Sequence, residues 1–162
     1  MAIEIERKFL VNTTDFKKES FQKIYIKQGF LNSNKNRVVR IRITNTDGYI
    51  TIKGKSFDEG TSRFEWEKEI SKKEAESLMQ LCETTPIEKN RYHVKNDEYV
   101  FEIDEFLGEN KGLIIAEIEL KSKNTVFNKP QWLGKEVTGK KKYYNSMLSN
   151  KPFSTWNKKS SR

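Results

Sequence analysis

The feature that most constrains this chain is an alternation of apolar and polar residues with a period of two, repeated in short segments. Successive side chains of a β-strand point to opposite faces, so this pattern is typical of strands with one buried face. Turn-forming residues such as Asn45-Thr46-Asp47-Gly48 separate the segments. The alternation predicts eight strands, over residues 2–11, 22–31, 37–45, 48–55, 62–70, 86–95, 98–106 and 112–122.

Two segments show helical spacing instead. Ser71-Lys72-Lys73-Glu74 matches a capping box, and apolar residues follow on one face, which predicts a helix over 71–82. A second apolar stripe, which includes Tyr143, Tyr144 and Leu148, predicts a basic helix over roughly 139–150. The fold class is therefore mainly β (α+β), with a few helices packed outside the strands.

The chain has the length of a single domain, and its charge is unevenly distributed. Of 162 residues 33% are charged, and the net charge is +8. Residues 140–162 hold seven Lys or Arg and no acid, so the rest of the chain is almost neutral. We predict a domain over 1–150 and a basic tail over 151–162. The tail is either a solvated end or a weak contact site for nucleic acid or another acidic surface.

The sequence contains no apolar run of the roughly 18 residues that a membrane span requires. Its first residues include Glu4 and Glu6, where a secretory signal would carry basic and then apolar residues. Cys82 is the single cysteine, so an intrachain disulfide is impossible. A cytoplasmic location without a membrane partner is expected.

The polar faces of the predicted strands carry almost only charge. The in-phase cations are Lys8, Arg40, Arg42, Lys53, Lys89 and Arg91, and the in-phase acids are Glu4, Glu6, Glu65, Glu67, Asp104, Glu117 and Glu119. Like charges two residues apart on a strand lie about 7 Å apart, which costs roughly 2 kcal/mol at an effective dielectric near 20. A closed barrel would offset this cost by bringing opposite charges together in one lumen. An open sheet with its charged face in water is the alternative.

The residue types restrict the chemistry of such a lumen. Clustered carboxylates are hard oxygen ligands suited to Mg²⁺ or Mn²⁺, and a chain with one His and one Cys has almost no means of building a zinc site. Arginine pairs and lysines beside these acids suit an anion with several phosphates. Hydrolysis of a phosphoanhydride by a metal-activated water uses this set of groups best.

Glu4-Ile5-Glu6-Arg7-Lys8 resembles the ExExK signature of CYTH proteins, the triphosphate tunnel metalloenzymes. The resemblance continues in order through Arg40-Ile41-Arg42, Thr51-Ile52-Lys53, Glu65-Trp66-Glu67, Lys89-Asn90-Arg91, Glu102-Ile103-Asp104, Glu117-Ile118-Glu119 and Gly134-Lys135-Glu136-Val137-Thr138. It covers residues 2 to about 150. The resemblance implies an eight-stranded antiparallel closed barrel whose charged tunnel binds a small-molecule triphosphate.

The resemblance also implies roles for individual residues. The expected ligands of Mg²⁺ or Mn²⁺ are Glu4, Glu6, Asp104, Glu117 and Glu119, with Glu65 and Glu67 as second-ion or water-orienting candidates. The expected triphosphate-binding residues are Lys8, Arg40, Arg42, Lys53, Lys89 and Arg91. Of these two sets, Glu4, Glu6, Lys8 and Lys89 are the expected catalytic residues. Glu136 is expected to position other groups.

The chain departs from the family pattern at Gln28-Gly29-Phe30-Leu31, where a Tyr is expected at position 30. Inorganic tripolyphosphate is the expected substrate, because the chain shows no insertion that would form a pocket for a base or a thiazole. The alternatives are a class IV-like adenylate cyclase acting on ATP and a non-catalytic polyphosphate- or nucleotide-binding module. We expect a monomer or a homodimer.

Overall fold

All eight predicted strands are present in the computed structural model, which describes residues 2–156. They are β1 (Ala2–Val11), β2 (Ser20–Asn32), β3 (Arg37–Ile43), β4 (Gly48–Gly54), β5 (Ser62–Ile70), β6 (Ile87–Asn96), β7 (Tyr99–Phe106) and β8 (Ile114–Glu119). Their ends lie within three residues of the predicted ones. The sequence does not predict a ninth strand, β9 (Leu133–Glu136), because four residues are too few to show an alternation.

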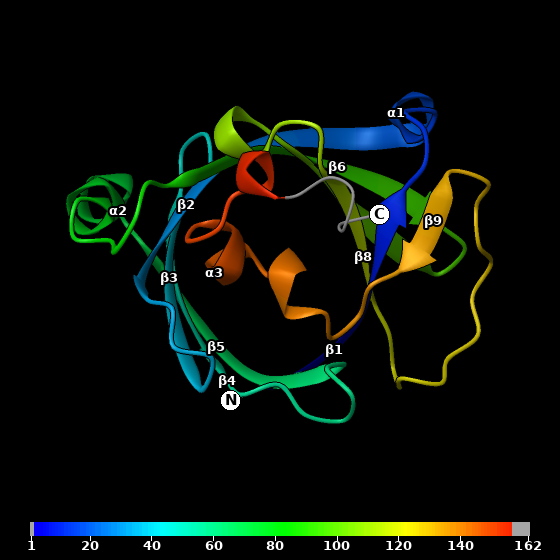
Figure 1. The fold of residues 1–162 in the computed structure, drawn as a ribbon, viewed down its shortest axis with the longest axis horizontal. Coiled ribbons are helices and arrows are strands. Elements are labelled where there is room, and N and C mark those ends of the chain that lie inside the picture. The colour runs from blue at the N-terminus through cyan, green and yellow to red at the C-terminus, as the bar shows by residue number, and fades with distance from the viewer. Residues whose placement is uncertain (1, 157–162) are drawn as a thin grey trace.

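The eight strands form a closed antiparallel ring, so the predicted barrel is confirmed (Figure 1). The order around the ring is β1, β5, β4, β3, β2, β6, β7 and β8. The first strand closes it, because residues 2–5 pair with β5 and residues 6–10 pair with β8. The short β9 pairs with the second half of β1, beside the ring. Closure gives every strand of the ring one face toward a common interior.

Helix α2 (Lys72–Met79) covers the outer face of the ring near β3 (Figure 1). It begins with the predicted capping box: the Glu74 backbone N–H donates to Ser71 Oγ, and the Ser71 N–H donates to Glu74 Oε1, both at 3.0 Å. Ala75 and Met79 are buried against Ile41 of β3. The predicted helix over 71–82 is thus confirmed in place and face, and it ends a few residues early.

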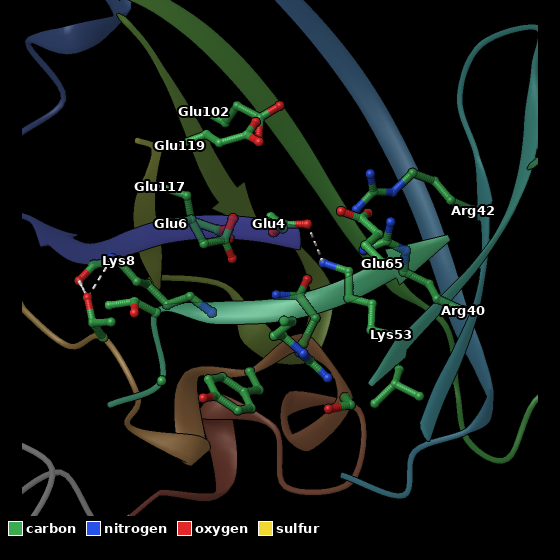
Figure 2. A pocket seen from close by; sticks show the side chains of 18 of the residues that line it. Glu4, Glu6, Lys8, Arg40, Arg42, Lys53, Glu65, Glu102, Glu117 and Glu119 are labelled. Carbon is green, nitrogen blue, oxygen red and sulfur yellow. Dashed lines mark hydrogen bonds and ion pairs between the residues drawn. The ribbon is translucent and has the colours of Figure 1, made fainter. Parts of the chain in front are cut away.

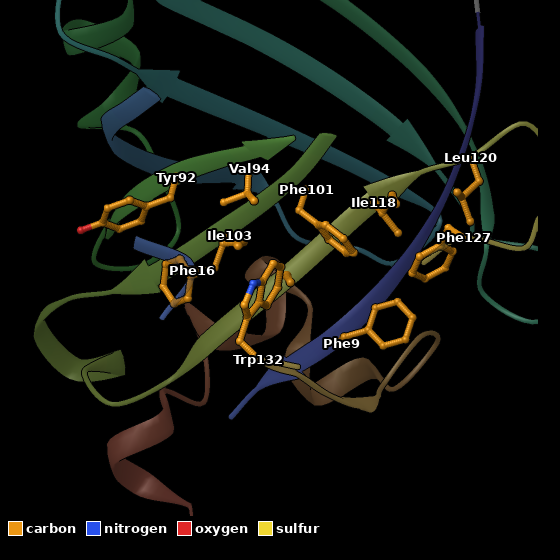
Figure 3. Close-up of a cluster of buried hydrophobic side chains, with 11 residues drawn as sticks. Phe9, Phe16, Tyr92, Val94, Phe101, Ile103, Ile118, Leu120, Phe127 and Trp132 are labelled. Atoms are coloured by element: carbon orange, nitrogen blue, oxygen red, sulfur yellow. The ribbon is translucent and has the colours of Figure 1, made fainter. Parts of the chain in front are cut away.

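A second outer surface, formed by β1, β6, β7 and β8, is covered by α1 (Phe16–Glu19) and by the chain between β8 and β9 (Figure 3). Phe16, Phe127 and Trp132 supply most of this cover. The ring of Trp132 lies edge-on to that of Phe101, with 5.1 Å between centroids, and to that of Phe16, with 5.9 Å. Aromatic packing therefore buries this outer face.

One end of the ring's interior is apolar. Side chains from six strands meet there in a buried cluster: Leu10, Phe30, Val38, Ile87, Phe106 and Ile115. Tyr143 and Leu148 pack onto this cluster from the C-terminal part of the chain. Phe153 and Trp156 add to its edge, next to the 3₁₀ turn η3 (Phe153–Thr155). The Phe153 backbone N–H donates to Asn110 Oδ1 at 2.8 Å, which joins η3 to the turn η1 (Gly108–Asn110).

The predicted helix over 139–150 is wrong in form and in position. This stretch, hereafter the capping segment (residues 139–150), consists of the 3₁₀ turn η2 (Lys141–Tyr143), an extended Tyr144 and the short helix α3 (Asn145–Leu148). In Figure 1 it lies within the outline of the ring. Its apolar side chains are buried against the interior cluster, so they are not available to cover the outside.

The predicted tail over 151–162 is only partly described, because residues 157–162 lie outside the described residues. Residues 151–156 pack near the capping segment, where the ring of Trp156 stands 5.4 Å from that of Tyr143. Within residues 2–156, none of the helices has the length and apolar character needed to cross a membrane.

Candidate active site

The ring encloses a cavity of about 300 Å³ whose lining is mostly charged. All the predicted cations line it, and so do all the predicted acids except Asp104. Arg63 and Glu102 also line the cavity. The charged lining residues are Glu4, Glu6, Lys8, Arg40, Arg42, Lys53, Arg63, Glu65, Glu67, Lys89, Arg91, Glu102, Glu117 and Glu119.

Most of the acids and most of the cations lie on different walls of the cavity, and Lys8 and Glu65 are exceptions (Figure 2). One wall is acidic because the registers of β1, β7 and β8 place glutamates side by side: Glu6 pairs with Glu119, and Glu117 pairs with Glu102. Arg40 and Arg42 of β3 and Lys53 of β4 form the facing wall. Lys53 Nζ reaches across to Glu4 Oε2 at 3.4 Å. Strand order and register therefore separate most of the charges by sign.

The cations lie deeper than several of the acids. Lys89 and Arg91 are 1% and 9% exposed, whereas the side chains of Glu67 and Glu102 are 41% and 42% exposed. The cavity is thus positively lined in its buried part and negatively lined where it opens. An anion bound at the cations would be largely removed from water, which strengthens its electrostatic contacts.

The carboxylates of the acidic wall repel one another. Burial and the neighbouring carboxylates of Glu117 and Glu4 raise the pKa of Glu6 well above its ordinary value. Burial and a hydrogen bond with Glu4 raise the pKa of Glu65 to about 7. Closely spaced carboxyls in a poorly solvated site do not all ionise easily, so such a pair shares a proton near neutral pH. A positive charge placed among them would relieve the repulsion.

Asp104 has a different environment. Its Oδ2 lies 2.7 Å from Lys89 Nζ, and Arg91 donates to both of its oxygens, at 2.7 and 2.9 Å. Burial would raise the pKa of Asp104, but Arg91 and Lys89 hold it well below its ordinary value. This carboxylate lies beneath the cavity lining with both oxygens occupied by cations. Through these contacts Asp104 holds Lys89 and Arg91 in place.

Arg40 and Arg42 of β3 are buried and half-buried, respectively, and have few partners. Arg42 donates from Nε and Nη2 to Gln28 Oε1, at 3.0 and 2.9 Å. Burial and the neighbouring Arg40 and Arg91 lower the pKa of Arg42 to about 9. Within residues 2–156, Arg40 Nε has no hydrogen-bond partner although it is buried. An unpaired buried donor is costly, and an anion in the cavity would satisfy it.

Lys8 is braced from outside the ring through Glu136. Arg7 binds Glu136 with two hydrogen bonds, at 2.9 and 2.7 Å, and Thr138 Oγ1 donates to the same carboxylate at 2.7 Å. The Lys8 backbone N–H in turn donates to Thr138 Oγ1 at 2.9 Å. These bonds fix the backbone that carries Lys8, which fits the positioning role expected of Glu136.

Phe30 faces the cavity, so the chain presents an apolar ring where the resemblance implies a tyrosine. Another tyrosine, Tyr144 of the capping segment, does line the cavity. Lys8 Nζ lies 4.9 Å from the centre of its ring, and its hydroxyl lies 3.5 Å from Ser56 Oγ. The sequence does not point to Tyr144 as a cavity residue, because its spacing suits an apolar helix face.

The model of the CYTH domain family matches residues 2–151 of this chain. The chain belongs to the CYTH family. A protein of Acetivibrio thermocellus named inorganic triphosphatase is 46% identical over 154 residues, which cover 94% of this chain and 97% of the relative. A protein of Nitrosomonas europaea with the same name is 35% identical over 150 residues, which cover 90% and 96%.

A solved structure confirms the CYTH fold. A crystal structure described as that of an inorganic triphosphatase superimposes with a TM-score of 0.66 at 32% identity, and the match covers 90% of this chain and 97% of the other. The family membership implied by the ordered charged motifs is therefore confirmed, together with the ring of eight strands.

CYTH membership implies dependence on a divalent metal, and the donor chemistry of the cavity fits one. Glu4, Glu6, Glu117 and Glu119 offer carboxylate oxygens, the ligands that hard divalent cations prefer. Within residues 2–156, no three His, Cys, Asp or Glu residues lie close enough together to form a ready-made metal site, so the fit rests on the chemistry of the donors.

Three cavity residues extend the predicted set. Arg63 is in phase with Glu65 on β5, and Glu102 is in phase with Asp104 on β7, so the period of two was sufficient to find both. Asn145 of α3 lines the cavity as well. No pattern in the sequence marks Asn145, because it lies on the capping segment and reaches the cavity only through the fold.

Proposed function

We propose that this protein hydrolyses inorganic tripolyphosphate in a reaction that depends on Mg²⁺ or Mn²⁺. The observation that carries this proposal is the pairing of buried cations with a facing wall of carboxylates in one small cavity. Cations alone would suffice for binding an anion, so the carboxylates indicate a site that also holds metal. Two CYTH relatives named inorganic triphosphatase support tripolyphosphate over ATP as the substrate.

The cations would hold the substrate by its phosphate oxygens: Lys8, Arg40, Arg42, Lys53, Lys89 and Arg91. Arginine binds phosphate oxygens with two parallel hydrogen bonds, and lysine acts as a point charge. Because these groups are prearranged by Asp104, Gln28 and Thr51, they need little reorganisation when charge develops on the leaving phosphate. Lys8 and Lys89 are the proposed catalytic cations.

The acidic wall would hold the metal through Glu4, Glu6, Glu117 and Glu119. A divalent cation bound there would supply charge neutralisation at phosphate oxygens and activation of a water. Glu4 and Glu6 are the proposed catalytic ligands, and Glu67 is a second-ion candidate nearer the opening. Asp104 is left out of this set because Lys89 and Arg91 occupy both of its oxygens.

Glu65 is the proposed water-orienting acid, because its carboxyl lines the cavity and is hydrogen-bonded to that of Glu4. The attacking water would therefore be oriented beside the metal-binding acids.

The test is phosphate release from tripolyphosphate, ATP and thiamine triphosphate, measured in parallel with Mg²⁺, with Mn²⁺ and with a chelator. We expect chelator-sensitive release that is fastest from tripolyphosphate. Release from ATP at an equal or higher rate would overturn the substrate assignment. Cyclic AMP formed from ATP and Mn²⁺ would favour the cyclase, and binding without release from any substrate would favour a binding module.

A further inference from the structure

Asn145 is the first residue of α3, and its side chain reaches the cavity from the capping segment. Its Oδ1 accepts a hydrogen bond from Lys89 Nζ at 2.7 Å and another from Gln28 Nε2 at 2.8 Å. Gln28, which is fully buried, accepts from Arg42 through Oε1 at 2.9 and 3.0 Å. Two amides thus link Lys89 of β6 with Arg42 of β3 along the wall that these strands form with β2.

The donors and acceptors available on each side chain fix the direction of every hydrogen bond in this series from Lys89 to Arg42. Arginine and lysine have only donors, so Arg42 must face the oxygen of Gln28 and Lys89 must face the oxygen of Asn145. The amide nitrogen of Gln28 is then left to donate to Asn145 Oδ1. The orientation of both amides follows from the cations at the two ends, and no flipped arrangement satisfies the same partners.

The same hydrogen bonds also determine how many donors of the Lys89 ammonium group remain available to a ligand. An ammonium group has three donors. Asp104 takes one at 2.7 Å and Asn145 takes another at 2.7 Å, which leaves one for an anion in the cavity. Asn145 therefore holds the direction in which Lys89 points, and through Gln28 it limits the rotation of the Arg42 guanidinium.

We propose that Asn145 is a positioning residue for triphosphate binding, which sets Lys89 directly and Arg42 through Gln28. This inference rests on the proposed function, since it assumes that these cations receive the phosphates. It couples the placement of the capping segment to the arrangement of the phosphate-binding cations. Displacing the capping segment would release both cations from their aligned positions.

A purely structural role is the competing explanation: Asn145 would anchor the capping segment without affecting the anion. Two substitutions separate these roles. Asn145→Ala removes the acceptor of Lys89 and Gln28. Asn145→Asp keeps the shape and both acceptor contacts but adds a negative charge beside Lys89, where it competes with phosphate. A structural anchor would lower the melting temperature but not the affinity for tripolyphosphate in Asn145→Ala, whereas a positioning residue would lower the affinity there. In Asn145→Asp the added charge lowers the affinity only if the side chain lies beside the bound anion.

The experiment is calorimetric titration of each purified variant with tripolyphosphate in the presence of EDTA, together with thermal unfolding of the same samples. We expect affinity to fall about tenfold in Asn145→Ala, the effect of one lost hydrogen bond to a charged group. We expect a larger fall, of about 100-fold, in Asn145→Asp, with a melting temperature no lower than that of the wild type. Asn150→Ala is the matched control, because Asn150 lies on the same segment and is exposed, and within residues 2–156 its side chain bonds only the Ser146 carbonyl.

Wild-type affinity in Asn145→Asp would overturn the inference even if Asn145→Ala failed to fold. Equal losses of affinity in Asn150→Ala would also overturn it, because they would reflect general loosening of the capping segment. The proposed function is tested separately, by measuring phosphate release from tripolyphosphate. Wild-type protein that binds tripolyphosphate without hydrolysing it would refute the proposed function and leave the Asn145 test intact. Wild-type protein that does not bind would refute both.

Discussion

The interior of the ring has two halves that are built by the same strands. Along β1, Glu4, Glu6 and Lys8 are followed in phase by Leu10, and along β8, Glu119 and Glu117 are followed by Ile115. Strands β6 and β7 repeat the change, from Lys89 to Ile87 and from Asp104 to Phe106. One half is the charged cavity and the other is a buried apolar cluster that the capping segment completes.

The difference between the halves shows how such a barrel combines stability with binding. The apolar half removes side chains from water and stabilises the fold. In the charged half, burial and like-charged neighbours raise the pKa of Glu6 and lower the pKa of Arg42, so keeping these two groups ionised costs stability in the absence of a ligand. The predictions below test this division.

The largest effect is expected from Glu6→Gln, in the charged half. The substitution removes one charge from the proposed metal ligands at nearly constant volume, so metal-dependent phosphate release should fall by at least about 100-fold. Circular dichroism should show an unchanged fold. Glu76→Gln on the exposed side of α2 is the control and should retain full activity. Wild-type turnover in Glu6→Gln would show that the metal assignment is wrong.

Two residues of β8, one from each half, should respond in opposite directions. Ile115→Ala opens a void in the apolar half and should cost about 2–5 kcal/mol of unfolding free energy, which lowers the melting temperature by roughly 5–15 °C. Glu119→Gln relieves repulsion in the charged half, where burial and the carboxylates of Glu4 and Glu102 raise the pKa of Glu119, and it should leave the melting temperature of the apoprotein equal or higher. Thermal unfolding in EDTA measures both. A comparable loss of stability in the two variants would remove the distinction between the halves.

Arg42→Met should separate binding from stability within the charged half. The KM for tripolyphosphate should rise about tenfold or more, since one charge-assisted contact to phosphate is lost. The apoprotein should melt about 2–4 °C higher, the shift produced by roughly 1 kcal/mol in a chain of this size. Steady-state kinetics and calorimetry provide the two readouts. A lower melting temperature would mean that the interior charges already neutralise one another without a ligand.

The smallest effect is a pH dependence of stability. The pKa of Glu65 in the folded protein is about 7, against an ordinary value of 4.5, so the folded state binds more protons than the unfolded state between these pH values. The contribution of Glu65 to stability is therefore complete below about pH 4.5 and is lost as the pH rises through about 7. Melting curves of Glu65→Gln should lack this decline. An identical pH profile in wild type and variant would exclude Glu65 as its source.

Much of this architecture can be predicted from the sequence because period two is a local property. The alternation assigns Lys53 and Glu65 to the interior without knowledge of their neighbours, and the same rule reaches Arg63 and Glu102. The alternation also predicts that the interior has a charged half and an apolar half, since each charged series ends in an apolar residue such as Leu10 or Ile115.

Other features depend on contacts between distant parts of the chain. The position of Asp104 is decided by the register that sets it opposite Arg91, and no property of its own strand reveals that pairing. The capping segment has the apolar spacing of an outer helix, but Tyr143 and Leu148 are buried against the interior cluster. Asn145 becomes a cavity residue only as a consequence of that placement.

The closure of the ring through β1 also has a consequence for how the protein folds. The strand that carries Glu4, Glu6 and Lys8 precedes the other strands in the chain, yet its partners include β8 and β9, near the opposite end. Folding dominated by such nonlocal pairings is slow, on the order of milliseconds to seconds. During biosynthesis β1 cannot pair with β8 until Glu119 has left the ribosome, so the proposed catalytic acids Glu4 and Glu6 meet Glu117 and Glu119 only late in synthesis.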